Sequence, residues 1–157
     1  MVIVETTVQE EAEIPDLTEP VVRRVVRRAL NQLGRLDPGS RYIVEVTFVT
    51  EDTIRELNMK YRGIDSPTDV LSFSQDPGDD EEEEFPLPPE GDGDHLGDVV
   101  ICPAALRPEA DELRELAFLA CHGTLHLLGW THCDEQRLRR MNRVTEDILA
   151  GVFPPEM

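Results

Sequence analysis

Residues 108–129 read PEADELRELAFLACHGTLHLLG and predict a long helix with one apolar face. The apolar positions recur at helical spacing through Leu113, Leu116, Ala117, Ala120, Thr124 and Leu127. Gly129 stands where a glycine commonly ends a helix, because glycine adopts the left-handed conformation at little cost. We therefore expect a helix over Pro108–Leu128 that packs through this face.

The rest of the chain alternates between strand and helix patterns. Strands are expected over Val2–Val8, Tyr42–Val49, Val70–Phe73 and Val99–Cys102. Further helices are expected from an N-cap at Thr18, with Pro20 in the first turn, to Gly34, then over Asp52–Tyr61 before Gly63, and over Glu135–Ala150. Because strands and helices interleave without a strict βαβ rhythm, the pattern predicts an α+β fold, a small mixed β-sheet packed with helices.

Composition limits the class of protein. A chain of 157 residues is the size of one domain and can bury its own core, so one domain over residues 1–157 is expected. No apolar run has the length of a membrane-spanning helix, and the acidic first twenty residues are unlike a signal or transit peptide. A soluble, cytoplasmic protein is therefore expected, with its three cysteines reduced and Cys102 in the core.

A net charge of −18 argues at first against a nucleic acid partner, since Lys and Arg drive phosphate binding. The acids are concentrated, however: ten lie in Asp76–Asp94, which also holds prolines and glycines but few apolar residues. This segment predicts a disordered or mobile acidic loop. The charge outside it leaves nucleic acid open as a partner.

Three of the four histidines form the pattern HxxxHxxGxxH, at His122, His126 and His132. Residues four apart on a helix lie on one face, so His122 and His126 suit one metal ion, and a turn at Gly129 can bring His132 to it. Zinc prefers four tetrahedral ligands, so three histidines leave one position open. The pattern predicts one catalytic zinc ion per chain.

Other residues near this pattern leave alternatives. Cys133 is an alternative ligand to His132, and as a fourth ligand it would indicate a closed structural site. His95 stands alone beside the acidic segment and is expected to be uninvolved. The spacing matches the metzincin peptidase signature except that Gly123 replaces the glutamate that serves as base. Without that base, phosphodiester cleavage fits the remaining groups better than peptide cleavage.

Three blocks resemble one known family: LNMKYRGIDSPTDVLSF at Leu57–Phe73, LGDVVIC at Leu96–Cys102 and HGTLHLLGWTH at His122–His132. They are similar to the YbeY family, bacterial endoribonucleases that mature ribosomal RNA. The resemblance implies a zinc-dependent, single-strand-specific endoribonuclease that acts in 16S ribosomal RNA 3′-end maturation and ribosome quality control. It implies small-subunit ribosomal RNA as partner, with ribosomal proteins or an assembly GTPase as further partners.

The resemblance also implies a role for Arg62, whose guanidinium suits phosphate, although pairing with Asp65 or Asp69 is the alternative from the residues alone. Asp69 and Asp98 are candidates for a base or an orienting carboxylate, and capping of a turn is an equal alternative for Asp69. Thr131 departs from the family, which commonly has aspartate before the third histidine. A metallopeptidase-like hydrolase and a non-catalytic, zinc-bearing ribosome assembly factor remain the rival functions.

Overall fold

A four-stranded mixed sheet lies at the centre of the molecule, as far as the structure describes it. This computed structural model describes residues 2–34, 39, 41–74, 94–106, 111–130 and 134–153. The strands are β1 (Val2–Val8), β2 (Tyr42–Phe48), β3 (Val70–Ser74) and β4 (Asp94–Ile101), in the order β1-β2-β4-β3. The first, second and fourth strands run parallel, and β3 is antiparallel to β4 at one edge. The expected α+β fold with a mixed sheet is confirmed.

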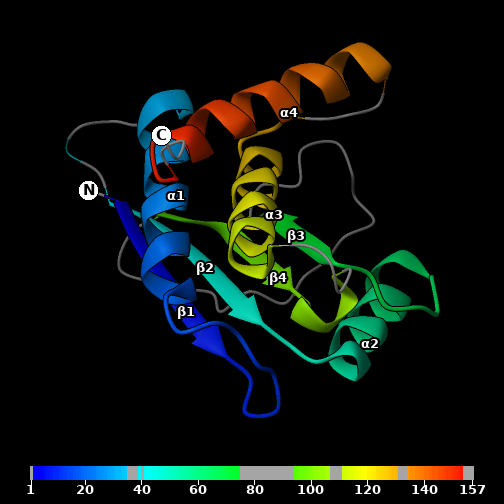
Figure 1. Ribbon diagram of the computed structural model, residues 1–157. Coiled ribbons are helices and arrows are strands. Elements are labelled where there is room, and N and C mark those ends of the chain that lie inside the picture. Colours follow the sequence, from blue (N-terminus) through cyan, green and yellow to red (C-terminus); the bar gives the residue numbers. More distant parts are fainter. Residues whose placement is uncertain are drawn as a thin grey trace.

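Helices cover the two faces of the sheet unequally. On one face α1 (Thr18–Leu33) and α3 (Glu112–Leu127) pack side by side, and α4 (Glu135–Ala150) runs across their ends (Figure 1). On the other face α2 (Glu51–Arg62) places Ile54 against Leu71 and Phe73 of β3. A short 3-10 helix, Pro103–Ala105, follows β4. Since α2 covers only the β3 end, the remainder of that face has no described helix above it.

The alternating pattern of β2 explains this arrangement. Val44, Val46 and Phe48 are fully buried in a cluster that includes residues of α1 and α3. Ile43, Glu45 and Thr47 alternate with them and are half-buried on the opposite face. We call the helix-covered side the α3 face and the opposite side the α2 face.

Most helix and strand boundaries lie within one residue of those expected, and three departures affect a cap or the start of an element. Thr18 is the first residue of α1, fully buried, and the N-cap is Leu17, so the assignment of Thr18 as the cap was wrong by one residue. The third helix begins at Glu112, where the Asp111 side chain accepts a hydrogen bond from the Arg114 backbone N–H; Pro108 lies outside the described residues. The last strand begins at Asp94, five residues before the expected Val99.

The early start of β4 shortens the expected acidic loop, because Asp94 belongs to the strand. The remainder of the loop, residues 76–93, lies outside the described residues. Among the helices that are described, none combines the length and the apolar character that crossing a membrane requires.

Candidate metal centre

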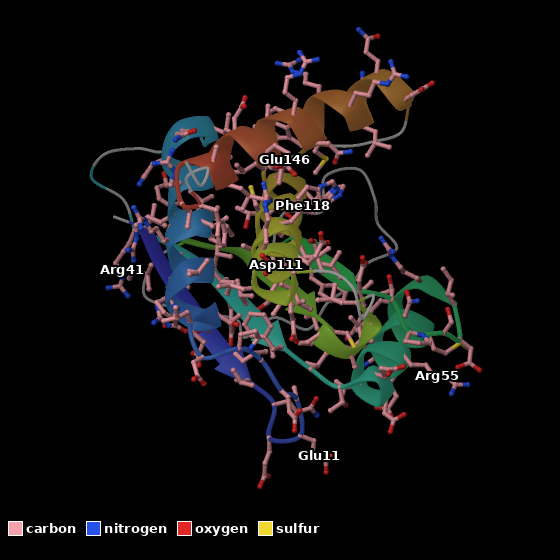
Figure 2. All side chains as sticks on the ribbon, in the orientation of Figure 1. Glu11, Arg41, Arg55, Asp111, Phe118 and Glu146 are labelled. Atoms are coloured by element: carbon pink, nitrogen blue, oxygen red, sulfur yellow. The ribbon has the colours of Figure 1, made fainter. Side chains whose placement is uncertain are left out.

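His122 and His126 lie together on the last two turns of α3, as their spacing predicts. Their ring centroids are 5.2 Å apart with an interplanar angle of 68°, and both residues are half-buried. The His122 ring also stacks on Phe118, with centroids 5.6 Å apart. Phe118 lies on α3 below α4 (Figure 2). The two imidazoles therefore occupy one helix face, partly shielded from solvent, with a separation that suits two ligands of one ion.

The end of α3 holds His126 in a defined orientation. Gly129 has a φ of 94°, so the chain turns there and Trp130 N–H donates to the Leu125 carbonyl at 3.0 Å. The Trp130 carbonyl returns to within 3.0 Å of His126 Nδ1. Because a carbonyl can only accept, Nδ1 carries the proton and Nε2 keeps its lone pair. A backbone partner of this kind fixes a histidine for metal coordination through the other nitrogen.

The expected third ligand cannot be placed in the same way. His132 lies outside the described residues, as do its neighbours Thr131 and Cys133. The choice between His132 and Cys133 therefore stays a prediction. Trp130, the last described residue before His132, lies beside His126. Its indole ring also packs against Arg140 of α4, whose guanidinium carbon is 5.5 Å from the indole centroid.

Gly123, between the two histidines, faces the sheet. A Cβ atom there would lie 2.7 Å from Val99 Cγ1 and 2.9 Å from Ser72 Oγ, closer than ordinary packing permits. Both neighbours belong to the α3 face of the sheet, where Ser72 pairs with Val99. A side chain at position 123 would therefore meet the sheet instead of reaching a metal on the histidine face, so no peptidase-type base fits at this position.

Arg62 and Asp69 lie in the region between α2 and β3. Arg62 is the last residue of α2 and is exposed. The pairing with Asp65 left open above is not formed, because the carboxylate of Asp65 is held by Arg55 Nε at 2.7 Å. Hydrogen bonding from Arg55 lowers the pKa of Asp65. Figure 2 shows Arg55 projecting from α2 at the periphery of the molecule.

Asp69 precedes β3, and its backbone carbonyl accepts a hydrogen bond from Cys102 N–H at 2.9 Å. Its side chain is exposed. Ser72, which touches Gly123, is three residues further along, roughly 10 Å at the usual rise of a strand. Asp69 is thus displaced along the sheet from the level of the histidines.

Asp98 lies on the α2 face, with the sheet between it and the histidines of α3. It pairs with Phe73, whereas its neighbour Val99 packs under Gly123. His95 does not stand alone, as the sequence suggested: Glu45, His95 and Asp98 have ligand atoms that all lie within 4.8 Å of one another. The pKa of Asp98 is raised to about 6, chiefly by burial; His95 opposes the shift, and the nearby Glu45 carboxyl group adds to it.

Sequence reasoning missed this second cluster because its three residues come from two strands. Glu45 and Asp98 are register partners, which only the pairing of β2 with β4 reveals. His95 and Asp98 are three apart, a spacing that puts side chains on opposite faces of a regular strand. A register shift at Ile43/Val44 leaves Leu96 as an extra residue and turns His95 to the side of Asp98.

Fold and site together define an α+β protein in which a helix with two paired histidines packs on a mixed sheet. Residues 6–152 match the family model described as Endoribonuclease YbeY. The chain belongs to the endoribonuclease YbeY family, as the three sequence blocks predict.

Curated relatives named endoribonuclease YbeY match along nearly the whole chain. The relative from Symbiobacterium thermophilum is 44% identical over 149 residues, which is 92% of each chain. The relative from Desulforamulus reducens is 38% identical over 154 residues, 95% of each chain. A solution structure of a Thermotoga maritima protein has a TM-score of 0.58 and covers 96% of this chain and 89% of its own; at 24% identity it supports the fold alone.

Proposed function

We propose that this protein is a metal-dependent, single-strand-specific endoribonuclease that acts in the 3′-end maturation of small-subunit ribosomal RNA. Family membership supports RNA as the substrate class. Ribosome quality control, a cytoplasmic location, and ribosomal proteins or an assembly GTPase as partners belong to the same proposal. The metal is zinc, one ion at this centre, held by His122, His126 and His132.

The orientation of His126 is the observation that best supports the metal centre. Its Nδ1–H donates to the Trp130 carbonyl at 3.0 Å, which makes Nε2 the nitrogen that can coordinate a metal, and His122 lies beside it on the same face. Imidazole nitrogen is a preferred zinc ligand, and three of them leave one tetrahedral position for substrate or water. When bound, zinc supplies a Lewis acid for a phosphoryl oxygen and acidifies water.

Arg62 is the proposed phosphate contact. In the described residues it takes part in no ion pair, and the carboxylate nearest in sequence, Asp65, already has Arg55. An exposed guanidinium presents parallel N–H donors that match two phosphate oxygens. Asp69 is a candidate base or orienting carboxylate in the same region. Asp98 is not part of this proposed centre, because its side chain is buried on the α2 face and the sheet separates it from the histidines. Arg62 differs in being exposed at the end of α2, next to Tyr61, whose ring contacts Phe73 of the edge strand β3.

A peptidase function is disfavoured by Gly123. The position that bears the general base in metzincins is here packed against Val99 and Ser72. A non-catalytic assembly factor is the alternative that the experiment must separate, because it would keep the metal and bind RNA without cutting it.

The test is cleavage of labelled single-stranded and duplex RNA of the same sequence, with and without chelator, by the wild type and by His126→Ala. We expect single strands to be cut, chelator to stop the reaction, added zinc to restore it, and His126→Ala to be inactive. RNA binding without cleavage at full metal occupancy would favour the assembly factor. Cleavage that persists in His126→Ala after chelation would overturn the metal centre.

A further inference from the structure

The α2 face of the sheet holds a cluster that the proposed nuclease does not use: Glu45 on β2, with His95 and Asp98 on β4. The bulge that creates it depends on Gly97, whose φ is 151°. A Cβ atom at Gly97 would clash with the Phe73 carbonyl oxygen. Only glycine therefore fits at position 97, in the bulge that turns His95 toward Asp98. The cluster is thus a consequence of the backbone geometry of β4.

The charges of this cluster are not balanced by the neighbouring protein. Glu5, Glu45 and Asp98 are register partners across β1, β2 and β4, so three carboxyl groups form one row. Like charges directly opposite one another on a sheet repel. Among the residues that the structure describes, no Arg or Lys forms an ion pair with any of the three; the single ion pair is His95 Nε2 to Asp98 Oδ1 at 3.7 Å.

Burial makes the imbalance costly. Asp98 is only 8% exposed, and its buried Oδ2 atom has no hydrogen-bond partner among the residues that the structure describes. A buried, unpaired carboxylate oxygen is strongly unfavourable unless a proton or a cation satisfies it. This oxygen belongs to the same cluster as Glu45 and His95. Because it can still accept a bond, it points to a cation held between the three side chains.

We propose that Glu45, His95 and Asp98 form a second metal site, for a divalent transition ion such as Zn²⁺, Co²⁺ or Mn²⁺, on the face of the sheet opposite the histidines of α3. The ligand atoms lie within 4.8 Å of one another. Zinc–ligand bonds are about 2.0 to 2.2 Å long, so only small rotations of the side chains are needed to surround an ion. One nitrogen with two carboxylates suits these ions better than Ca²⁺ or Mg²⁺, which prefer all-oxygen sites.

Binding changes one hydrogen bond of the cluster. His95 Nε2 now lies 3.1 Å from the Gly97 carbonyl oxygen, to which it donates. Coordination through Nε2 requires the tautomer with the proton on Nδ1, so the ion replaces the Gly97 contact. The ion would cross-link β2 to β4 and neutralise the carboxyl row, and the site is independent of the proposed nuclease centre.

The test uses the full chain with the α3 centre disabled, His122→Ala/His126→Ala, titrated calorimetrically with Zn²⁺. We expect this variant to retain one bound ion per chain. Adding Glu45→Gln should weaken that binding by at least about tenfold. Glu5→Gln is the matched control, because it removes the same charge from the same row but no ligand; its affinity should change by less than about twofold. Equal losses of zinc affinity in the two variants would show that the carboxyl row attracts zinc only through its charge, and would overturn the site.

A second readout identifies the ligand and guards against binding elsewhere. The chain has four histidines, so the double variant retains His95 and His132. Sub-stoichiometric Mn²⁺ should broaden the ring NMR signals of His95, assigned by His95→Gln, before those of His132. In the otherwise unchanged chain, Glu45→Gln should lower zinc stoichiometry from two to one. A stoichiometry of one that Glu45→Gln leaves unchanged, or broadening confined to His132, would refute the proposal.

Discussion

Gly123 of α3 approaches Val99 of β4 so closely that a Cβ atom at position 123 would lie 2.7 Å from Val99 Cγ1. Ser72 Oγ donates to the Gly123 carbonyl at 3.2 Å, which ties the same turn of α3 to β3. The residues on either side are His122 and Thr124, the latter fully buried. The glycine therefore sets the distance between the helix and the sheet, and with it the position of the paired histidines.

Replacement of this glycine should destabilise the protein. Gly123→Ala forces Val99 or the helix to move, and overpacking of a core costs about 1 to 3 kcal/mol. Alanine recovers part of this cost, because it favours the helix over glycine by about 1 kcal/mol. We expect a net loss of up to about 2 kcal/mol in the free energy of unfolding, measured by urea titration. Gly39→Ala is the control, since no atom of the described residues lies within 4 Å of its Cβ position. An unchanged urea midpoint for Gly123→Ala would show that α3 can move away from the sheet freely.

Loss of either helix histidine should remove one metal ion without unfolding the chain. His122→Ala and His126→Ala each delete a ligand of the α3 centre, while the core clusters of Val44, Val46 and Leu116 stay intact. Elemental analysis after dialysis should give one zinc fewer per chain than the wild type, and the far-UV spectrum should be unchanged. His95→Gln is the comparison, because its zinc loss must be additive with that of His126→Ala if two sites exist.

Local patterns in the sequence predict most elements of this fold. The alternation in β2 and the helical spacing in α3 are visible in sequence because each reflects a single buried face. The start of β4 was missed because residues 94–98 contain two aspartates, a histidine and a glycine instead of an apolar run. Strand order is also invisible locally, since the β2–β4 pairing joins segments separated by about fifty residues.

The candidate sites divide in the same way. His122 and His126 are predictable because one helix presents both. Asp98 stands out from its block in the sequence, but its face of the sheet depends on the register with Phe73 and Glu45, which no spacing rule gives. His95 was dismissed because the bulge that turns it toward Asp98 is a tertiary feature.

The two described cysteines should be unreactive in the folded protein. Cys121 and Cys102 are fully buried, and burial raises the pKa of the Cys102 thiol and raises the pKa of Cys121 to about 12. At pH 8 a thiol with this pKa is ionised to about one part in ten thousand, and the thiolate is the reactive form. Mass spectrometry after brief iodoacetamide treatment should show neither modified in buffer and both modified in urea. Cys133, outside the described residues, is not covered by this prediction. Rapid native modification of Cys121 would mean that α3 and α4 separate readily.

Arg62 provides the sharpest test of RNA as the substrate. If its guanidinium holds a phosphate in the transition state, Arg62→Ala should lower kcat/KM for single-stranded RNA by about 30- to 1,000-fold, which corresponds to the loss of about 2 to 4 kcal/mol for one preorganised donor. The melting temperature should not change, because Arg62 is exposed and the Asp65 carboxylate forms its ion pair with Arg55. Arg62→Lys should recover only part of the activity, since lysine keeps the charge but not the planar fork.

Arg55→Ala is the matched control on the same helix. It removes an equal charge together with the ion pair to Asp65, a fully exposed pair of the kind that contributes little to stability. Its cleavage rate should stay within about twofold of the wild type, measured at several salt concentrations because loss of any positive charge weakens RNA binding at low salt. If both variants lose activity equally, and added salt abolishes the difference from the wild type, Arg62 contributes only a non-specific electrostatic attraction for RNA. Loss confined to Arg62→Ala at all salt concentrations would establish a specific phosphate contact.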